Sequence, residues 1–220
     1  DASTERPPQV RPDLSIQIAL SNSIAHVVIT NAYVETVLKD HVLRDIRLIV
    51  DKDAAFKLVN MDIPGGTAGR ALDVLLEACG FEYTLDPLGC VVFVGAPAKV
   101  ARARRLAGVL GNIPDPTLDR SCRRCCSAGG EPIENLLKSL ESVRADALDS
   151  PSAADRISIA LDMQWDDRRG RVSSFLLTDV PVKSMLWAML VLSETDVVLD
   201  GSMLRILPVA TDTPATRQPK

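Results

Sequence analysis

The chain contains one sequence pattern twice. Asp62-Ile63-Pro64, an apolar helical run and Leu85-Asp86 are followed downstream by Asp179-Val180-Pro181, another apolar helical run and Leu199-Asp200. The leading Asp residues are 117 positions apart and the trailing ones 114, so the copies differ by three residues, most simply at Gly65-Gly66-Thr67. A unit repeated along a chain predicts a repeat architecture.

Hydrophobic periodicity predicts the same order of elements in both units: helix, two strands, helix, two strands. The first unit is expected to have helices over 32–43 and 68–79 and strands over 47–50, 56–60, 81–85 and 90–94. The second is expected to have helices over 133–143 and 182–193 and strands over 157–161, 172–178, 196–199 and 203–207. Extra strands are expected over 14–20 and 25–30. The predicted class is α+β, with two tandem repeats whose helices pack on small mixed sheets.

These elements divide the chain into a first domain over 14–96 and a second over 131–208. Between them we expect a basic helix over 97–110 and a Cys-rich linker up to residue 130, with Arg102, Arg104 and Arg105 on a solvated helix face. The tails, 1–13 and 209–220, are rich in Pro, Thr and charge, so we expect them to be disordered.

Composition excludes some functions. The chain has 220 residues, of which 46% are hydrophobic and only 4% aromatic, and its net charge is −4. A negative charge and few aromatic residues argue against a nucleic-acid-binding protein, which needs a basic field or stacking platforms. No apolar run approaches the roughly 20 residues that cross a bilayer. The sequence starts at Asp1, as expected either of a mature protein from which a signal peptide has been removed or of a trimmed chain.

The first unit has three segments that carry a likeness to a known family: residues 58–64, 71–76 and 79–86. They follow the pattern "nvPl..aLd.LL..tgl.y..d" and resemble the short N-terminal domain shared by secretins and TonB-dependent receptors. The likeness covers 24–95, and 132–208 less well, because Trp187-Ala188-Met189-Leu190 replaces the Leu-Asp motif there. The resemblance implies a bacterial envelope protein that faces the periplasm and docks to another protein.

The candidate chemical groups do not form a catalytic set. Cys122-Arg123-Arg124-Cys125-Cys126 has half of a zinc-ribbon spacing and lacks a second ligand pair nearby, so disulfides within the linker or between chains are favoured over a metal. Cys79 and Cys90 are expected in the core, either as thiols or bridged to each other. We expect the Gly65 to Arg70 segment to be a lengthened turn, with an anion site as the alternative. His26 and His41 match no catalytic motif, and Asp166 to Gly170 is expected to be a solvated loop.

The helix over 182–193 has almost no polar side and must be covered. One alternative is that the other domain or the linker covers it. The other is that it docks a partner, with Trp187 as the anchor and Met185 and Val191 beside it. The strand over 203–207, with Met203 and Arg205, is expected to be an exposed sheet edge that recruits a partner strand.

The sequence therefore favours a non-enzymatic, extracytoplasmic protein-interaction module of an envelope secretion, transport or signalling system. It needs no cofactor or metal. Its expected partners are envelope proteins, including TonB-linked components, and a second copy of the chain. The alternative is a small-molecule-binding or enzymatic α+β protein, whose site would form between the units where Asp62, Asp179 and the Gly65-Gly66 turn converge.

Overall fold

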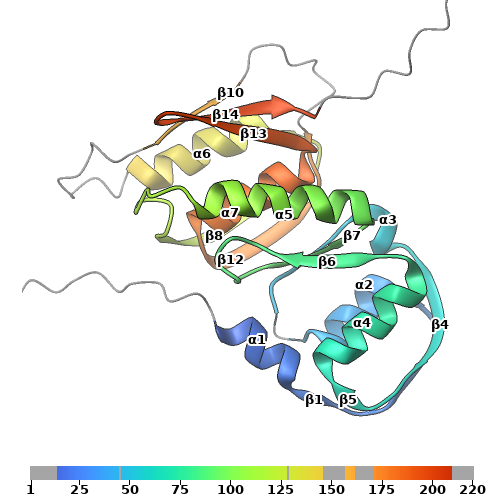
Figure 1. The fold of residues 1–220 in the computed structure, drawn as a ribbon. Coiled ribbons are helices and arrows are strands. Elements are labelled where there is room, and N and C mark those ends of the chain that lie inside the picture. The colour runs from blue at the N-terminus through green and yellow to red at the C-terminus, as the bar shows by residue number, and fades with distance from the viewer. Residues whose placement is uncertain (1–13, 45, 128, 146–156, 162–170, 210–220) are drawn as a thin grey trace, which may run out of the picture.

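The computed structural model describes residues 14–44, 46–127, 129–145, 157–161 and 171–209 (Figure 1). These residues form an α+β fold of helices and small two- or three-stranded sheets, which confirms the predicted class. The tails 1–13 and 210–220 and the loop at Asp166 to Gly170 lie outside the described residues.

Besides a short two-residue ladder, the first half has two sheets with helices between them. In one, β2 (Val27–Tyr33) pairs antiparallel with β4 (Leu58–Ile63). In the other, β7 (Val92–Gly95) lies between β3 (Leu48–Val50), to which it is parallel, and β6 (Glu82–Leu85), to which it is antiparallel. The helices are α2 (Val34–Val37), which continues as the π-helix η1 (Leu38–Val42), and α4 (Ala68–Cys79). The shorter elements are α1 (Leu14–Ser21), β1 (Ser23–Ile24), α3 (Lys52–Ala55) and β5 (Gly66–Thr67).

The second half follows the same pattern of strand pairing. The antiparallel pair is β8 (Ser121–Ser127) with β12 (Phe175–Pro181). In the three-stranded sheet, β14 (Met203–Pro208) is parallel to β10 (Ser158–Leu161) and antiparallel to β13 (Thr195–Asp200). The helices are α6 (Ile133–Ala145) and α7 (Val182–Leu192), and the short strands are β9 (Glu131–Pro132) and β11 (Arg171–Val172).

The helix α5 (Pro97–Gly111) follows β7 and joins the two halves (Figure 1). Its buried residues Val100, Ala103, Leu106 and Leu110 belong to one apolar cluster with α6 and α7. That cluster also contains Ile49 and Phe93, which lie on one face of the β3-β7-β6 sheet. Because Val92 and Val94 belong to the other core, with α2 and α4, this sheet is buried on both faces and lies between the two cores.

Local signals explain the helices that were predicted well. The helix α4 starts and ends as expected: the Thr67 hydroxyl accepts a hydrogen bond from the Arg70 N–H, and Gly80 follows with φ 73° and ψ 28°. The predicted strand over 14–20 is wrong. Its apolar residues alternate, but the segment forms α1, with Ile16 buried and Ile18 exposed.

Two boundaries also differ from the prediction. Phe56 was expected in a half-buried strand, yet β4 starts at Leu58 and the Phe56 side chain is exposed. Residues 121–127, expected in a linker, form β8, because an antiparallel partner in β12 satisfies their backbone groups.

Candidate functional site

Of the five residues that the sequence predicts for partner binding, three are buried in the structure. Met185 and Trp187 have no exposed surface and Val191 retains 3%. The Trp187 Nε1 donates a hydrogen bond of 2.9 Å to the Ala103 carbonyl in α5, and α5 covers α7. In this fold these three side chains are not accessible to a partner. Of the two alternatives for α7, the structure therefore contains the one in which the segment between the domains covers the helix.

Met203 and Arg205 are exposed, but the strand that carries them is not a sheet edge. The order of the sheet is β10-β14-β13, so β14 is paired on both sides. The prediction that 203–207 could recruit a partner strand is therefore wrong, because both of its backbone ladders are already occupied.

The residues proposed for a site between the units do not come together in a described pocket. Asp62 pairs with His26 on the exposed face of the β2 and β4 pair. The Asp179 carbonyl accepts a hydrogen bond of 3.1 Å from Arg47. Gly66 pairs with Ile24 in the short β1 and β5 ladder. Neither of the two described pockets includes Asp62, Asp179 or the Gly65-Gly66 turn.

The cysteines occupy different environments. Cys122 is buried in β8, and Cys126, in the same strand, is exposed. Cys79 at the end of α4 carries a free thiol, so the Cys79–Cys90 bridge is not formed in this structure. Burial raises the pKa of the Cys79 thiol above its usual value, against the opposing effect of the Lys57 charge. No group of three or more metal-ligating side chains occurs among the residues that the structure describes.

The three arginines of α5 contact both halves of the protein. Arg104 and Arg105 keep more than half of their side-chain surface exposed, in line with the predicted solvated face, and Arg102 is partly buried. Arg102 donates a hydrogen bond of 2.6 Å to the Val191 carbonyl at the end of α7. Arg105 forms an ion pair with Asp196 in β13. Arg104 points to the first half, where it donates a hydrogen bond of 3.0 Å to the Tyr83 carbonyl in β6.

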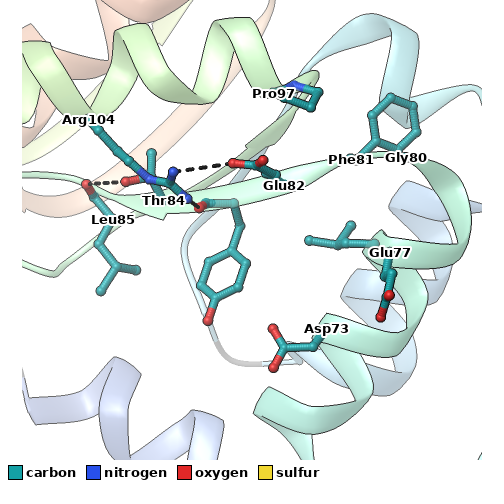
Figure 2. Close-up of a pocket in the computed structure, with 11 residues that line it drawn as sticks. Asp73, Glu77, Gly80, Phe81, Glu82, Thr84, Leu85, Pro97 and Arg104 are labelled. Atoms are coloured by element: carbon teal, nitrogen blue, oxygen red, sulfur yellow. Dashed lines mark hydrogen bonds and ion pairs between the residues drawn. The ribbon is translucent and has the colours of Figure 1, made fainter.

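The largest described pocket is an open groove of about 790 Å³ beside β6 (Figure 2). All four residues of β6 line it. The helix α4 contributes Asp73, Leu76 and Glu77 on one side, and Pro97 and Arg104 of α5 lie on the other. We call this feature the β6 groove.

The β6 groove has an acidic side and a neutralised side. Arg104 Nη1 lies 3.2 Å from Glu82 Oε2, so these two charges compensate each other. Asp73 and Glu77 are exposed on α4, one helical turn apart. Burial, and next the charge of Asp73, raise the pKa of the Tyr83 hydroxyl, while Arg104 acts in the opposite direction. The groove therefore carries a local excess of negative charge.

The groove follows a free strand edge. In the order β3-β7-β6, β6 is paired on one side only within the part of the chain that the structure describes. The sequence predicted this strand from the alternation of Phe81, Tyr83 and Leu85, but not its position at an edge. Strand order depends on contacts between residues far apart in the chain, and no signal in the strand itself reports it.

Comparison of the chain with known protein families, curated proteins and solved structures finds no match. Within the described residues, none of the helices is both long enough and apolar enough to span a membrane.

Proposed function

We propose that the chain is a non-enzymatic protein-interaction module that works outside the cytoplasm, in an envelope secretion, transport or signalling system of a bacterium. The observation that carries the proposal is the unpaired edge of β6, which lies along an open groove. Unpaired strand edges are common templates for binding other chains, and most folds cover them.

We propose also that the two halves are tandem copies of one short domain, similar to the N-terminal domain of secretins and TonB-dependent receptors. Two observations support this. The motif around Asp62 recurs around Asp179, and each half combines an antiparallel pair with a sheet whose central strand has one parallel and one antiparallel neighbour. The β3-β7-β6 sheet and the β10-β14-β13 sheet correspond in this arrangement.

Site-specific photo-cross-linking tests the interaction. A photoreactive amino acid is placed at Glu77 in the β6 groove, and in a control at Asp40, which is exposed on η1. Both proteins are irradiated in a bacterial envelope extract. We expect discrete cross-linked proteins from position 77 that are absent from position 40. Equal or no cross-linking at the two positions would contradict the proposal.

A small-molecule-binding or enzymatic protein is the second candidate, and the β6 groove is the observation that favours it. Its volume lies in the range of ligand pockets, and Leu76, Phe81 and Leu85 give it an apolar part. A metabolite that raises the melting temperature of the wild type but not of a Phe81→Glu variant, whose wild-type side chain is only partly buried, would support this candidate over the first if position 77 is also silent in cross-linking.

A further inference from the structure

The backbone of β6 presents specific hydrogen-bonding groups to the groove. The Asp86 N–H donates a hydrogen bond of 3.0 Å to the Val91 carbonyl opposite it, and the Val91 N–H donates to the Asp86 carboxylate, so this pair occupies a hydrogen-bonded position of the hairpin. Bonded and non-bonded pairs alternate along an antiparallel ladder. Leu85 opposite Val92 and Tyr83 opposite Val94 are therefore non-bonded pairs, and their N–H and C=O groups point away from β7.

One of these four outward groups is already occupied. The Tyr83 carbonyl accepts the hydrogen bond from Arg104 Nη2 at 3.0 Å. Among the described residues, the Leu85 carbonyl has only the Thr84 hydroxyl as a partner, at 3.5 Å, the long limit of a hydrogen bond. Three outward groups are left: the N–H groups of Tyr83 and Leu85 and the Leu85 carbonyl. Their spacing along β6 matches that of the hydrogen bonds that an added strand would form.

The charged side chains around the β6 edge determine which kind of partner segment can bind there. Charged groups lie on either side of β6 (Figure 2). Above the strand, Arg104 of α5 pairs with Glu82 of the strand itself, and below it lie Asp73 and Glu77 of α4. No ion pair joins Asp73 or Glu77 to a cation among the described residues. A segment with Lys or Arg at alternate positions would place its charges near these carboxylates.

Resting on the function proposed above, we propose that the β6 edge takes up an extended, positively charged segment of a partner protein as the fourth strand of the β3-β7-β6 sheet. The added strand bonds to the outward backbone groups of Tyr83 and Leu85, and its basic side chains face Asp73 and Glu77.

Binding of a synthetic extended peptide that alternates lysine and valine tests the charge preference, with a glutamate-valine peptide as its counterpart. Titration calorimetry at low salt measures both affinities. We expect only the lysine peptide to bind, with an affinity that falls as salt rises. Tighter binding of the glutamate peptide, or no binding of either, would overturn the inference.

Three variants separate the contribution of the groove from general charge effects. Asp73→Asn with Glu77→Gln is expected to weaken binding of the lysine peptide about fivefold, as for exposed charge pairs. The matched control, Asp40→Asn with Asp200→Asn, removes the same charge from exposed positions elsewhere and should leave the affinity unchanged. Arg104→Ala frees the Tyr83 carbonyl and removes the competing cation, so it is expected to tighten binding. Weaker binding after Arg104→Ala would contradict the assigned geometry.

Amide hydrogen exchange followed by NMR tests strand addition itself. The Tyr83 and Leu85 amides should exchange fast in the free protein and become protected when the lysine peptide binds. Peptide binding without this protection would overturn the fourth strand. Cross-linking of an envelope protein at position 77 combined with failure of these peptide experiments would leave the proposed function standing and remove only the inference about its partner.

Discussion

Trp187 of α7 donates its indole N–H to the backbone carbonyl of Ala103 in α5, at 2.9 Å. The indole is completely buried, and its ring meets Phe93 of β7 edge-on, with the centroids 6.4 Å apart and the planes at 89°. The Trp187 side chain belongs to the second half of the protein and contacts both α5 and a sheet of the first half. A buried N–H with a partner and an edge-to-face aromatic pair are both stabilising, so Trp187 holds the two halves together.

We expect Trp187→Phe to lower the free energy of unfolding by about 1–3 kcal/mol and Trp187→Ala by about 3–5 kcal/mol, because the larger deletion also leaves a cavity. Urea unfolding measures both values. The control is Leu176→Ala, whose side chain is 58% exposed and which should change stability by less than about 1 kcal/mol. A Trp187→Ala variant as stable as the wild type would contradict the burial of α7.

A second contact between the halves involves a buried carboxylate. Asp86 is 4% exposed and accepts hydrogen bonds from the backbone N–H groups of Cys90 and Val91, at 2.5 and 2.8 Å. The Ser184 hydroxyl of α7 donates another to the second oxygen. The carboxylate thus orders the hairpin loop and joins that loop to α7.

We expect Ser184→Ala to cost about 1 kcal/mol, as one hydrogen bond is lost, and Asp86→Ala to cost about 3 kcal/mol, because it leaves several donors unsatisfied. A double-mutant cycle read by urea unfolding should show coupling between the two changes. Ser139→Ala, at an exposed position of α6, is the control and should be close to neutral. Additive effects of the Asp86 and Ser184 changes would argue against the contact.

The sequence predicted individual elements better than their assembly. The helices α4, α5 and α7 were found within one residue at each end, because their apolar spacing agrees with a Thr cap, an N-terminal Pro or a following Gly. The strand β8 was missed, because Cys122 to Cys126 with its two arginines has neither alternation nor β-branched residues, and only pairing with β12 stabilises it.

The candidate site was predicted in part. Alternation placed β6 correctly, but its edge position and its groove arise from α4 and α5, which pack on either side of it. For α7 the sequence left two alternatives, cover by another part of the chain or docking of a partner, and the structure contains the first. The apolar sequence of a helix indicates that it must be covered but not which segment covers it. Here the cover is α5, of which the sequence predicted only the solvated face that carries its arginines.

The turn after α4 offers a paired test of backbone conformation. Gly80 has φ 73°, and an added Cβ would meet no atom within 4 Å, so only the backbone conformation opposes a side chain there. We expect Gly80→Ala to destabilise the protein by about 1 kcal/mol. Gly108 lies inside α5, also with open space at its Cβ position, and Gly108→Ala should stabilise by about 0.5–1 kcal/mol. Thermal unfolding of the two variants should shift in opposite directions, and a shift in the same direction would contradict the left-handed cap.

The ammonium group of Lys99 links acidic residues from both halves. Its Nζ lies 2.7 Å from Asp51 Oδ1, at the start of α3, and 3.5 Å from Glu194 Oε1, just after α7. Burial lowers the pKa of Lys99, but the hydrogen bond to Asp51 and the charges of Asp51, Glu194 and Asp53 together outweigh it, so the pKa is raised above 10.5.

A raised pKa in the folded state means that Lys99 stabilises the fold fully at pH values below its unfolded pKa, near 10.5, and that this contribution is lost as the pH rises through the higher folded pKa. We expect Lys99→Met to be about 1 kcal/mol less stable than the wild type near neutral pH, since the side chain is partly exposed. The difference should stay constant to about pH 10 and shrink above it. Urea unfolding of both proteins from neutral to alkaline pH measures this. Lys39→Met, which removes an exposed pair with Glu35 within one helix, is the control and should cost less. A difference that grows with pH would show that Lys99 is destabilised, not stabilised, by its surroundings.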